Sequence, residues 1–193
     1  MDSNNSLIHK QVKKIIEKFD TNDPFKIAKE SNISIKYLNN LEDLLGIYAV
    51  FERKRFIFLN ANMDEYMMRM VLAHELGHDT LHRHLTKNSP FHEYELFDIT
   101  SQPEYEANIF AAHLLLDDDE VAGLAKDNRT DVEIAGILNV NINLLIFKMN
   151  EMNRYGANYN LRHSPKGNFF SKIKPWFLNY FYKGDQYDCS NKW

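Results

Sequence analysis

Hydrophobic positions recur at three- and four-residue intervals over much of the chain, as they do along amphipathic helices. Leu7–Phe19 has this spacing and predicts a first helix. Asp23 followed by Pro24 predicts an N-cap and a first helical turn, which open a short second helix that continues to about Glu30. The N-terminal region is therefore predicted to be helical.

A region rich in β-branched and aromatic residues follows. Ile33–Leu38 predicts one strand, and Gly46–Phe51 and Arg55–Asn60 predict two more, separated only by the charged residues 52–54. Two such runs joined by a short polar segment are typical of a β-hairpin. We therefore expect a small sheet in this part of the chain.

The helical spacing returns after the strands and persists to residue 154. Helices are predicted over Glu65–His84, from Pro103-Glu104 to Leu116, from Thr130 or Asp131 to Leu138, and from Asn141 to Arg154; a polar loop covers 85–103, and the acidic run 117–120 ends one helix or caps the next. Beyond residue 156 no period is evident. Two helices, a small sheet and then mostly helices predict an α+β fold.

The composition is that of an ordinary globular domain. The chain has 193 residues, of which 44% are apolar and 26% charged, and a net charge of −4; this fits one domain, or one domain with a small appendage. Such a weak charge gives no sign of nucleic-acid binding, and no apolar stretch approaches the roughly 20 residues of a transmembrane helix. A polar N-terminus without a signal peptide and a single cysteine, Cys189, predict a cytoplasmic protein. The oligomeric state is not readable from the sequence.

One segment of the predicted helix over 65–84 carries a metal-binding pattern. The segment His74–His78 reads H-E-x-x-H, and residues four apart lie on one face of an α-helix, about 6 Å apart along its axis. Two histidines in this arrangement can bind one zinc ion. Glu75 lies about 100° around the helix, where it can reach a water held by that metal and take its proton. Apolar neighbours indicate that the motif belongs to a buried helical stretch.

Two histidines farther along the same helix are candidates for the third ligand that catalytic zinc requires. His84 has the spacing of the pattern H-E-x-x-H-x-x-G-x-x-H, but this chain has Leu81 where that pattern needs a turning Gly. We therefore expect the helix to continue, which puts His84 about 9 Å beyond His78 along the axis. His82 is likewise out of reach of the metal, although it could contact a ligand. The simpler interpretation of His82 and His84 is a solvated helix end.

A carboxylate on the next helix is the other candidate for the third ligand. Glu104 and Asn108 lie on one face of that helix, so Glu104 can complete a His2Glu site, and Asn108 can bind the free ring nitrogen of a ligand histidine. Glu106 is the alternative ligand. It lies about 200° around from Glu104, so both cannot face the metal, and the simpler interpretation of Glu106 is a solvated helix face.

The two motifs together resemble the ImmA/IrrE family of metallopeptidases. The resemblance covers about residues 46–138 and rests on H-E-L-G-H with a following L-H, and on E-x-E-A-N-x-F-A-A-x-L-L from Glu104 onward. It implies a zincin-like fold and a gluzincin-like zinc site in which Glu104 joins His74 and His78. One departure is that the usual L-L-M-P ending is replaced by Leu-Leu-Leu-Asp at 114–117, which changes the helix exit and not the ligands.

The resemblance also implies a function. It predicts a zinc-dependent endopeptidase that cleaves an intracellular DNA-binding repressor or another transcription factor at a specific site, in a mobile element, a prophage or a stress response. Glu75 would then be the general base and afterwards the acid. The alternative is a non-enzymatic regulator that binds a repressor and holds a structural metal. A His2Glu site also accepts divalent ions other than zinc.

Two weaker expectations concern the substrate. An extended peptide could add to the small sheet as a further strand, and we expect the Arg55–Asn60 strand to be the edge it joins. His113, on the second motif helix, is a candidate oxyanion donor or substrate contact, although a structural histidine is the simpler interpretation. The substrate, the cleavage site and the activating signal cannot be deduced from the sequence.

Charge and motifs divide the chain into three predicted parts. Residues 1–127 form the metallopeptidase domain, with the small sheet packed on the H-E-x-x-H helix and the second ligand helix. Residues 128–155 resemble a helix-turn-helix, but Lys148 is the only Lys or Arg between residues 131 and 153, so direct DNA binding is not expected. Residues 156–193 form an aromatic tail; residues 154–193 carry 7 Lys and Arg against 2 Asp and Glu, whereas residues 1–153 carry 16 against 25.

Overall fold

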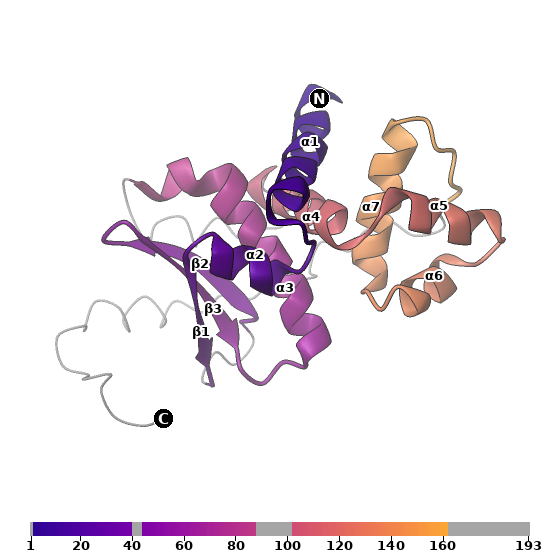
Figure 1. The fold of residues 1–193 in the computed structure, drawn as a ribbon. Coiled ribbons are helices and arrows are strands. Elements are labelled where there is room, and N and C mark those ends of the chain that lie inside the picture. Colours follow the sequence, from indigo (N-terminus) through magenta and orange to yellow (C-terminus); the bar gives the residue numbers. More distant parts are fainter. Residues whose placement is uncertain (1, 40–43, 88–101, 162–193) are drawn as a thin grey trace.

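The computed structural model describes residues 2–39, 44–87 and 102–161 (Figure 1). It confirms the α+β class. Most of the predicted polar loop, and the aromatic tail from residue 162 with its cysteine, lie outside the described residues. The elements in chain order are α1 (Asp2–Phe19), α2 (Pro24–Glu30), β1 (Ile33–Leu38), β2 (Gly46–Phe51), β3 (Lys54–Asn60), α3 (Glu65–Gly77), η1 (His78–His82), η2 (Arg83–Lys87), α4 (Gln102–Leu115), α5 (Asp118–Lys126), α6 (Asp131–Ile137) and α7 (Ile142–Arg154).

Side-chain caps set where several helices begin. Asp23 and Asn141 each accept a hydrogen bond from the second residue of the helix they cap, α2 and α7, and Asp64 accepts one from the third residue of α3. Thr130 forms a reciprocal capping box at the start of α6. Asp117 caps α5, which decides between the two roles that the sequence left open for the acidic run. Because each cap satisfies backbone N–H groups that the first turn leaves unpaired, these starts could be predicted from local sequence.

The three strands form a mixed sheet. Their order is β1-β3-β2, with β1 parallel to β3 and β2 antiparallel to β3. β2 and β3 are the predicted hairpin. Glu52 and Arg53 at its tip have φ angles of 48° and 65°, and a two-residue type I′ turn requires positive φ at both positions.

One expectation about this sheet was wrong. β3 is the central strand and is paired on both sides, so Arg55–Asn60 offers no free edge to a peptide. The cause is the parallel pairing of β1 with β3, a contact between distant parts of the chain that the hairpin pattern does not reveal. Within the described part of the sheet, the edge strand on the hairpin side is β2.

The motif helix changes its geometry at the second histidine. α3 ends at Gly77, a π-helical turn covers His78–His82, and a 3-10 turn covers Arg83–Lys87. The chain therefore continues in a helical path beyond Leu81, as the missing glycine predicted. Short π-helical segments are rare and are frequent at functional sites.

α3 lies between the sheet and α4. It contacts β2, β3 and α2 as well as α4, while α1 packs along α4 (Figure 1). The crossing of α3 and α4 is tight at Gly77, where a Cβ would lie 3.0 Å from Cα of Ala107 and 3.2 Å from Cβ of Phe110. Small residues thus bring the two motif helices together.

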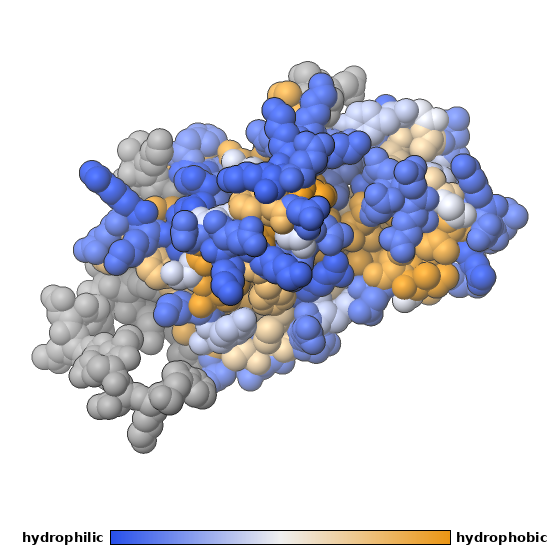
Figure 2. Space-filling view, in the orientation of Figure 1, coloured by the Kyte–Doolittle hydropathy of each residue, from blue (hydrophilic) through white to orange (hydrophobic). Residues whose placement is uncertain are grey.

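The last three helices form a second group beside α4. α7 packs on α4, and α6 packs on α7. The chain bends by 111° between α6 and α7, an angle typical of a helix-turn-helix. α6 exposes Val132 and Ile137, and Figure 2 shows hydrophobic surface on this side of the molecule. Lys148 is buried, so residues 131–153 present no exposed basic side chain to a phosphate. Among the described helices, none by itself is both long and apolar enough to cross a bilayer.

The substitution Gly77→Ala should lower the free energy of unfolding by about 1–3 kcal/mol, because an added methyl group must push α4 away from α3. Equilibrium urea unfolding measures this change. The matched control is Gly136→Ala in α6, since a Cβ at Gly136 would have no neighbour within 4 Å. Alanine there should instead stabilise the helix, by up to about 1 kcal/mol. The same effect at both glycines would contradict the tight crossing.

Candidate metal centre

Three buried side chains converge where α3 crosses α4. His74 lies in the last turn of α3, His78 opens η1, and Glu104 lies in the first turn of α4. The Nε2 atoms of the two histidines are 3.1 Å apart, and each lies 3.1 Å from a different oxygen of Glu104. All three residues are less than one-tenth exposed.

The donor set fits a metal ion. Two imidazole nitrogens and one carboxylate are the ligands of a His2Glu zinc site, and ligands at 2.0–2.1 Å from a tetrahedral zinc lie roughly 3.3 Å from one another. The observed separations of 3.1 Å are close to that value. Where both Nε2 atoms are unprotonated, a cation between them would remove the repulsion of their facing lone pairs. The group can therefore hold a divalent ion.

Asn108 orients His74 from one turn farther along α4. The Oδ1 atom of Asn108 lies 3.0 Å from Nδ1 of His74. Because an amide oxygen only accepts, Nδ1 donates, and the lone pair of Nε2 is available on the side of Glu104 and His78. The structure thus places Asn108 where the i, i+4 spacing with Glu104 predicted.

The electrostatics of the group are set by burial and by one carboxylate. Burial opposes protonation of His74, but Glu104 raises the pKa of this residue above its ordinary value. Burial lowers the pKa of His78 to about 4. Burial also favours the neutral form of Glu104, yet the two histidines hold the pKa of its carboxyl below the usual range. These directions favour an ionised Glu104 beside the two histidines, and a metal that bound here would require both Nε2 atoms to be unprotonated.

Glu75 lies against β2. Its carboxylate accepts a hydrogen bond from the backbone N–H of Tyr48, and burial raises its pKa to about 8. Its Oε2 atom is buried and has no hydrogen-bond partner among the described residues. Gly46 allows the strand to come this close, because a Cβ there would lie 2.9 Å from Oε1 of Glu75 and 2.5 Å from Cγ1 of Val71. A buried carboxylate with one unpartnered oxygen is suited to accept a proton.

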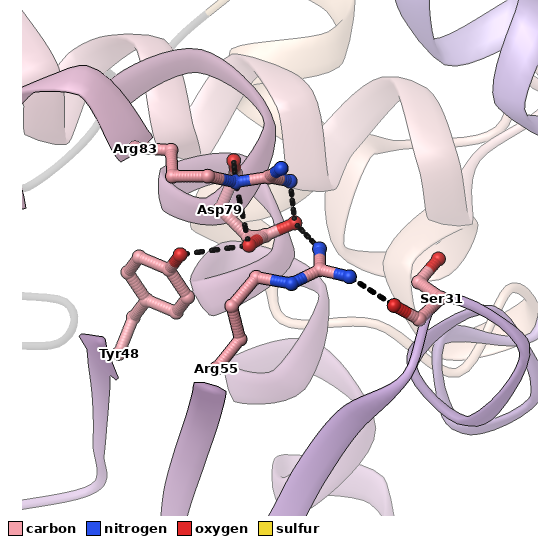
Figure 3. Close-up of polar contacts among 5 residues, drawn as sticks. All are labelled: Ser31, Tyr48, Arg55, Asp79 and Arg83. Carbon is pink, nitrogen blue, oxygen red and sulfur yellow. Dashed lines mark hydrogen bonds and ion pairs between the residues drawn. The ribbon is translucent and has the colours of Figure 1, made fainter. Parts of the chain in front are cut away.

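A buried carboxylate on η1 joins the motif helix to the sheet (Figure 3). Asp79 accepts hydrogen bonds from Tyr48 Oη at 2.7 Å, Arg55 Nη1 at 2.8 Å and Arg83 Nη2 at 2.6 Å. Arg55 also donates to the backbone oxygen of Ser31. Burial and the neighbouring Asp79 raise the pKa of Tyr48. The network fixes β2, and with it the amide that contacts Glu75, relative to the helix.

Asp79 was missed by the sequence analysis. The only sequence signal is an acidic residue directly after the second histidine, and its partners come from β2, β3 and η2. A contact network of this kind depends on strand placement, which spacing along one helix does not give.

Two residues assigned to solvated helix surface are instead buried or half-buried beside the cluster. Nδ1 of His82 lies 3.1 Å from Nδ1 of His78, and Nε2 of His82 lies 3.0 Å from Oε2 of Glu106. The interpretation as solvated helix surface was wrong because α4 packs across η1 and covers this turn. The alternative for His82, a contact with one of the motif histidines, agrees with its position beside His78. Glu106 does not join the ligand group, and His84 is exposed.

The structure does not bring His113 to the cluster. His113 is nine residues from Glu104 along α4, about 13.5 Å along the axis. Its ring stacks on His9 at 4.5 Å, and its Nδ1 lies 3.2 Å from Nζ of Lys148. Burial, followed by Lys148, lowers its pKa to about 3.

The surroundings of His113 form a second group of possible ligands. His9, His113 and Asp118 place ligand atoms within 4.8 Å of one another. Lys148 contacts His113 and pairs with Asp118. The ammonium group supplies the positive charge that a metal would otherwise supply, so we do not assign a metal to this group.

Comparisons with known proteins identify the family of the chain. The family model described as the IrrE N-terminal-like domain, Peptidase_M78, matches residues 16–150, which include α3, η1 and α4. A protein of Bacillus phage phi105, named "Uncharacterized immunity region protein 2", is 34% identical over 113 residues, covering 58% of this chain and 70% of that protein. The family match spans more than half of the chain and confirms the resemblance drawn from the two motifs: the chain belongs to the IrrE N-terminal-like family of peptidases.

Proposed function

We propose that this protein is a zinc-dependent endopeptidase whose metal is held by His74, His78 and Glu104. The observation that carries the proposal is a buried group in which the two Nε2 atoms lie 3.1 Å apart and each lies 3.1 Å from one oxygen of Glu104. The orientation of His74 by Asn108 supports it, because metal-binding histidines are commonly fixed through their second ring nitrogen. Membership of a peptidase family supports the reaction class.

Zinc in such a site lowers the pKa of water and polarises a carbonyl group. Glu75 then has two tasks. It accepts the proton of the attacking water on its unpartnered oxygen, and it delivers that proton to the nitrogen of the departing amine as the peptide C–N bond breaks. The Tyr48 amide holds the other side of the carboxylate, and Asp79 anchors the Tyr48 ring.

The substrate we propose is an extended segment of a cytoplasmic repressor or other transcription factor. Among the described strands, β2 is the edge strand beside Glu75, so a peptide that added to this edge would bring its backbone next to the carboxylate. A flexible linker between folded domains can adopt such a strand. The relative named as a phage immunity region protein supports a regulatory role in a mobile element.

We expect the purified chain to bind one zinc ion, and chelation to lower its melting temperature, because a ligand that binds only the folded state stabilises it. Glu104→Ala should abolish both zinc binding and the stabilisation by added zinc. Metal analysis and thermal unfolding with and without zinc measure this. The control is Glu17→Ala on the exposed face of α1, which should behave as wild type. A Glu104→Ala protein that binds zinc like wild type would contradict the ligand assignment.

Glu75→Gln should reduce substrate cleavage by about 100- to 10,000-fold, since general acid–base catalysis contributes that much, and should leave zinc binding intact. The assay compares new protein N-termini in cells that express wild type or Glu75→Gln, followed by cleavage of the identified partner with purified protein.

Two outcomes would argue against this function. Wild-type cleavage by the Glu75→Gln protein would remove Glu75 from the reaction. A zinc-loaded wild-type protein that binds a repressor tightly and leaves it intact would instead favour the non-enzymatic regulator.

A further inference from the structure

The two ligand histidines are supported in different ways. Nδ1 of His74 contacts the neutral amide of Asn108 at 3.0 Å. Nδ1 of His78 contacts a second histidine, His82, at 3.1 Å, and His82 in turn contacts the carboxylate of Glu106 at 3.0 Å. At Nδ1, only the contacts of His78 therefore lead to a carboxylate, that of Glu106.

The protons of this chain of contacts can be placed by valence. A histidine that binds a metal through Nε2 is neutral and carries its proton on Nδ1. His78 therefore donates to Nδ1 of His82, which must accept and so carries its own proton on Nε2. That proton is donated to Oε2 of Glu106. Each donor in the series meets an acceptor. This assignment leaves Nε2 of His78, the ring nitrogen that faces Glu104, without a proton.

We propose that His82 and Glu106 are positioning residues for the metal: together they hold His78 in the tautomer that binds metal and increase the electron donation of its ring. This inference rests on the proposed metal site. A carboxylate that accepts the proton of a ligand histidine raises the basicity of the ligand, and here His82 transmits that effect from Glu106 to His78.

The residues around the series hold it in place. His82 is buried under α4, so water does not replace its contacts. The other oxygen of Glu106 accepts a hydrogen bond of 2.7 Å from Gln102, which fixes the carboxylate at both oxygens. His78 and His82 are the first and last residues of the π-helical turn, and their ring centroids are 5.2 Å apart.

The test measures zinc affinity in the full-length protein by competition with a chromophoric chelator. His82→Leu and Glu106→Ala should each weaken zinc binding by about 10- to 100-fold, as is typical when the partner of a ligand histidine is removed. His82→Gln should recover most of the affinity, because its amide can accept from His78 and donate to Glu106. The control is His84→Leu, an exposed neighbour outside the series, which should bind zinc like wild type.

Two further readouts separate positioning from general packing. Because the two residues act in series, the double variant His82→Leu/Glu106→Ala should bind zinc about as weakly as His82→Leu alone. The visible spectrum of the cobalt-substituted protein should change in His82→Leu and Glu106→Ala and return towards wild type in His82→Gln. Glu106→Gln removes the charge with little change of shape and should give an intermediate loss, which keeps the test valid if the larger truncations unfold.

The outcomes distinguish this inference from the proposed function. Wild-type zinc affinity and an unchanged cobalt spectrum in Glu106→Gln and His82→Leu would overturn the positioning role and leave the metal site standing. A wild-type protein that binds no zinc would overturn both.

Discussion

The close packing of α3 against α4 at Gly77 is the contact on which the site depends. A Cβ at that position would lie only 3.0 Å from the Ala107 backbone, and Ala107 is fully buried. Because the helix backbones approach so closely, the short reach of a glutamate suffices for Glu104 to contact both histidines. A wider crossing would leave two imidazoles facing each other without an anion, which is an unfavourable arrangement in a buried site.

Two of the buried charges, Asp79 and Lys148, are paired within the fold. Asp79 is surrounded by two arginines and a tyrosine hydroxyl, and the ammonium of Lys148 pairs with Asp118. Unpaired buried charges are strongly destabilising, whereas paired and hydrogen-bonded ones are tolerated. The unpartnered oxygen of Glu75 is one of a few buried polar atoms without a hydrogen-bond partner among the described residues, and it is the one that lies next to a residue of the His/His/Glu group.

One helix supplies nearly all the groups that organise the two motif histidines. α4 contributes Glu104 to the ligand group, Asn108 to His74 and Glu106 to His82. The sheet has the complementary task. β2 holds Glu75 through a backbone amide, and Asp79 ties that strand to the turn after His78. The proposed metal ligands and the proposed proton acceptor are therefore positioned by different elements that meet at α3.

The sequence by itself determined the local features of this protein. The helical period of 3.6 residues places His74 and His78 on one face of their helix, and Glu104 and Asn108 on one face of the next. The side chains of Asp23, Thr130 and Asn141 mark where three helices begin. All of these depend only on residues within a turn or two. The two motifs also identified the family, because together they are specific where either alone is weak.

Only the tertiary structure decided the features that depend on which elements become neighbours. The parallel pairing of β1 with β3 made Arg55–Asn60 the central strand. The covering of η1 by α4 turned His82 from an expected solvated helix end into a buried contact of His78. His113 stacks on His9 and lies outside the site. Periodicity specifies which face of an element is apolar or polar. Long-range packing decides which partner covers that face, and it therefore decided the surroundings of the proposed metal ligands.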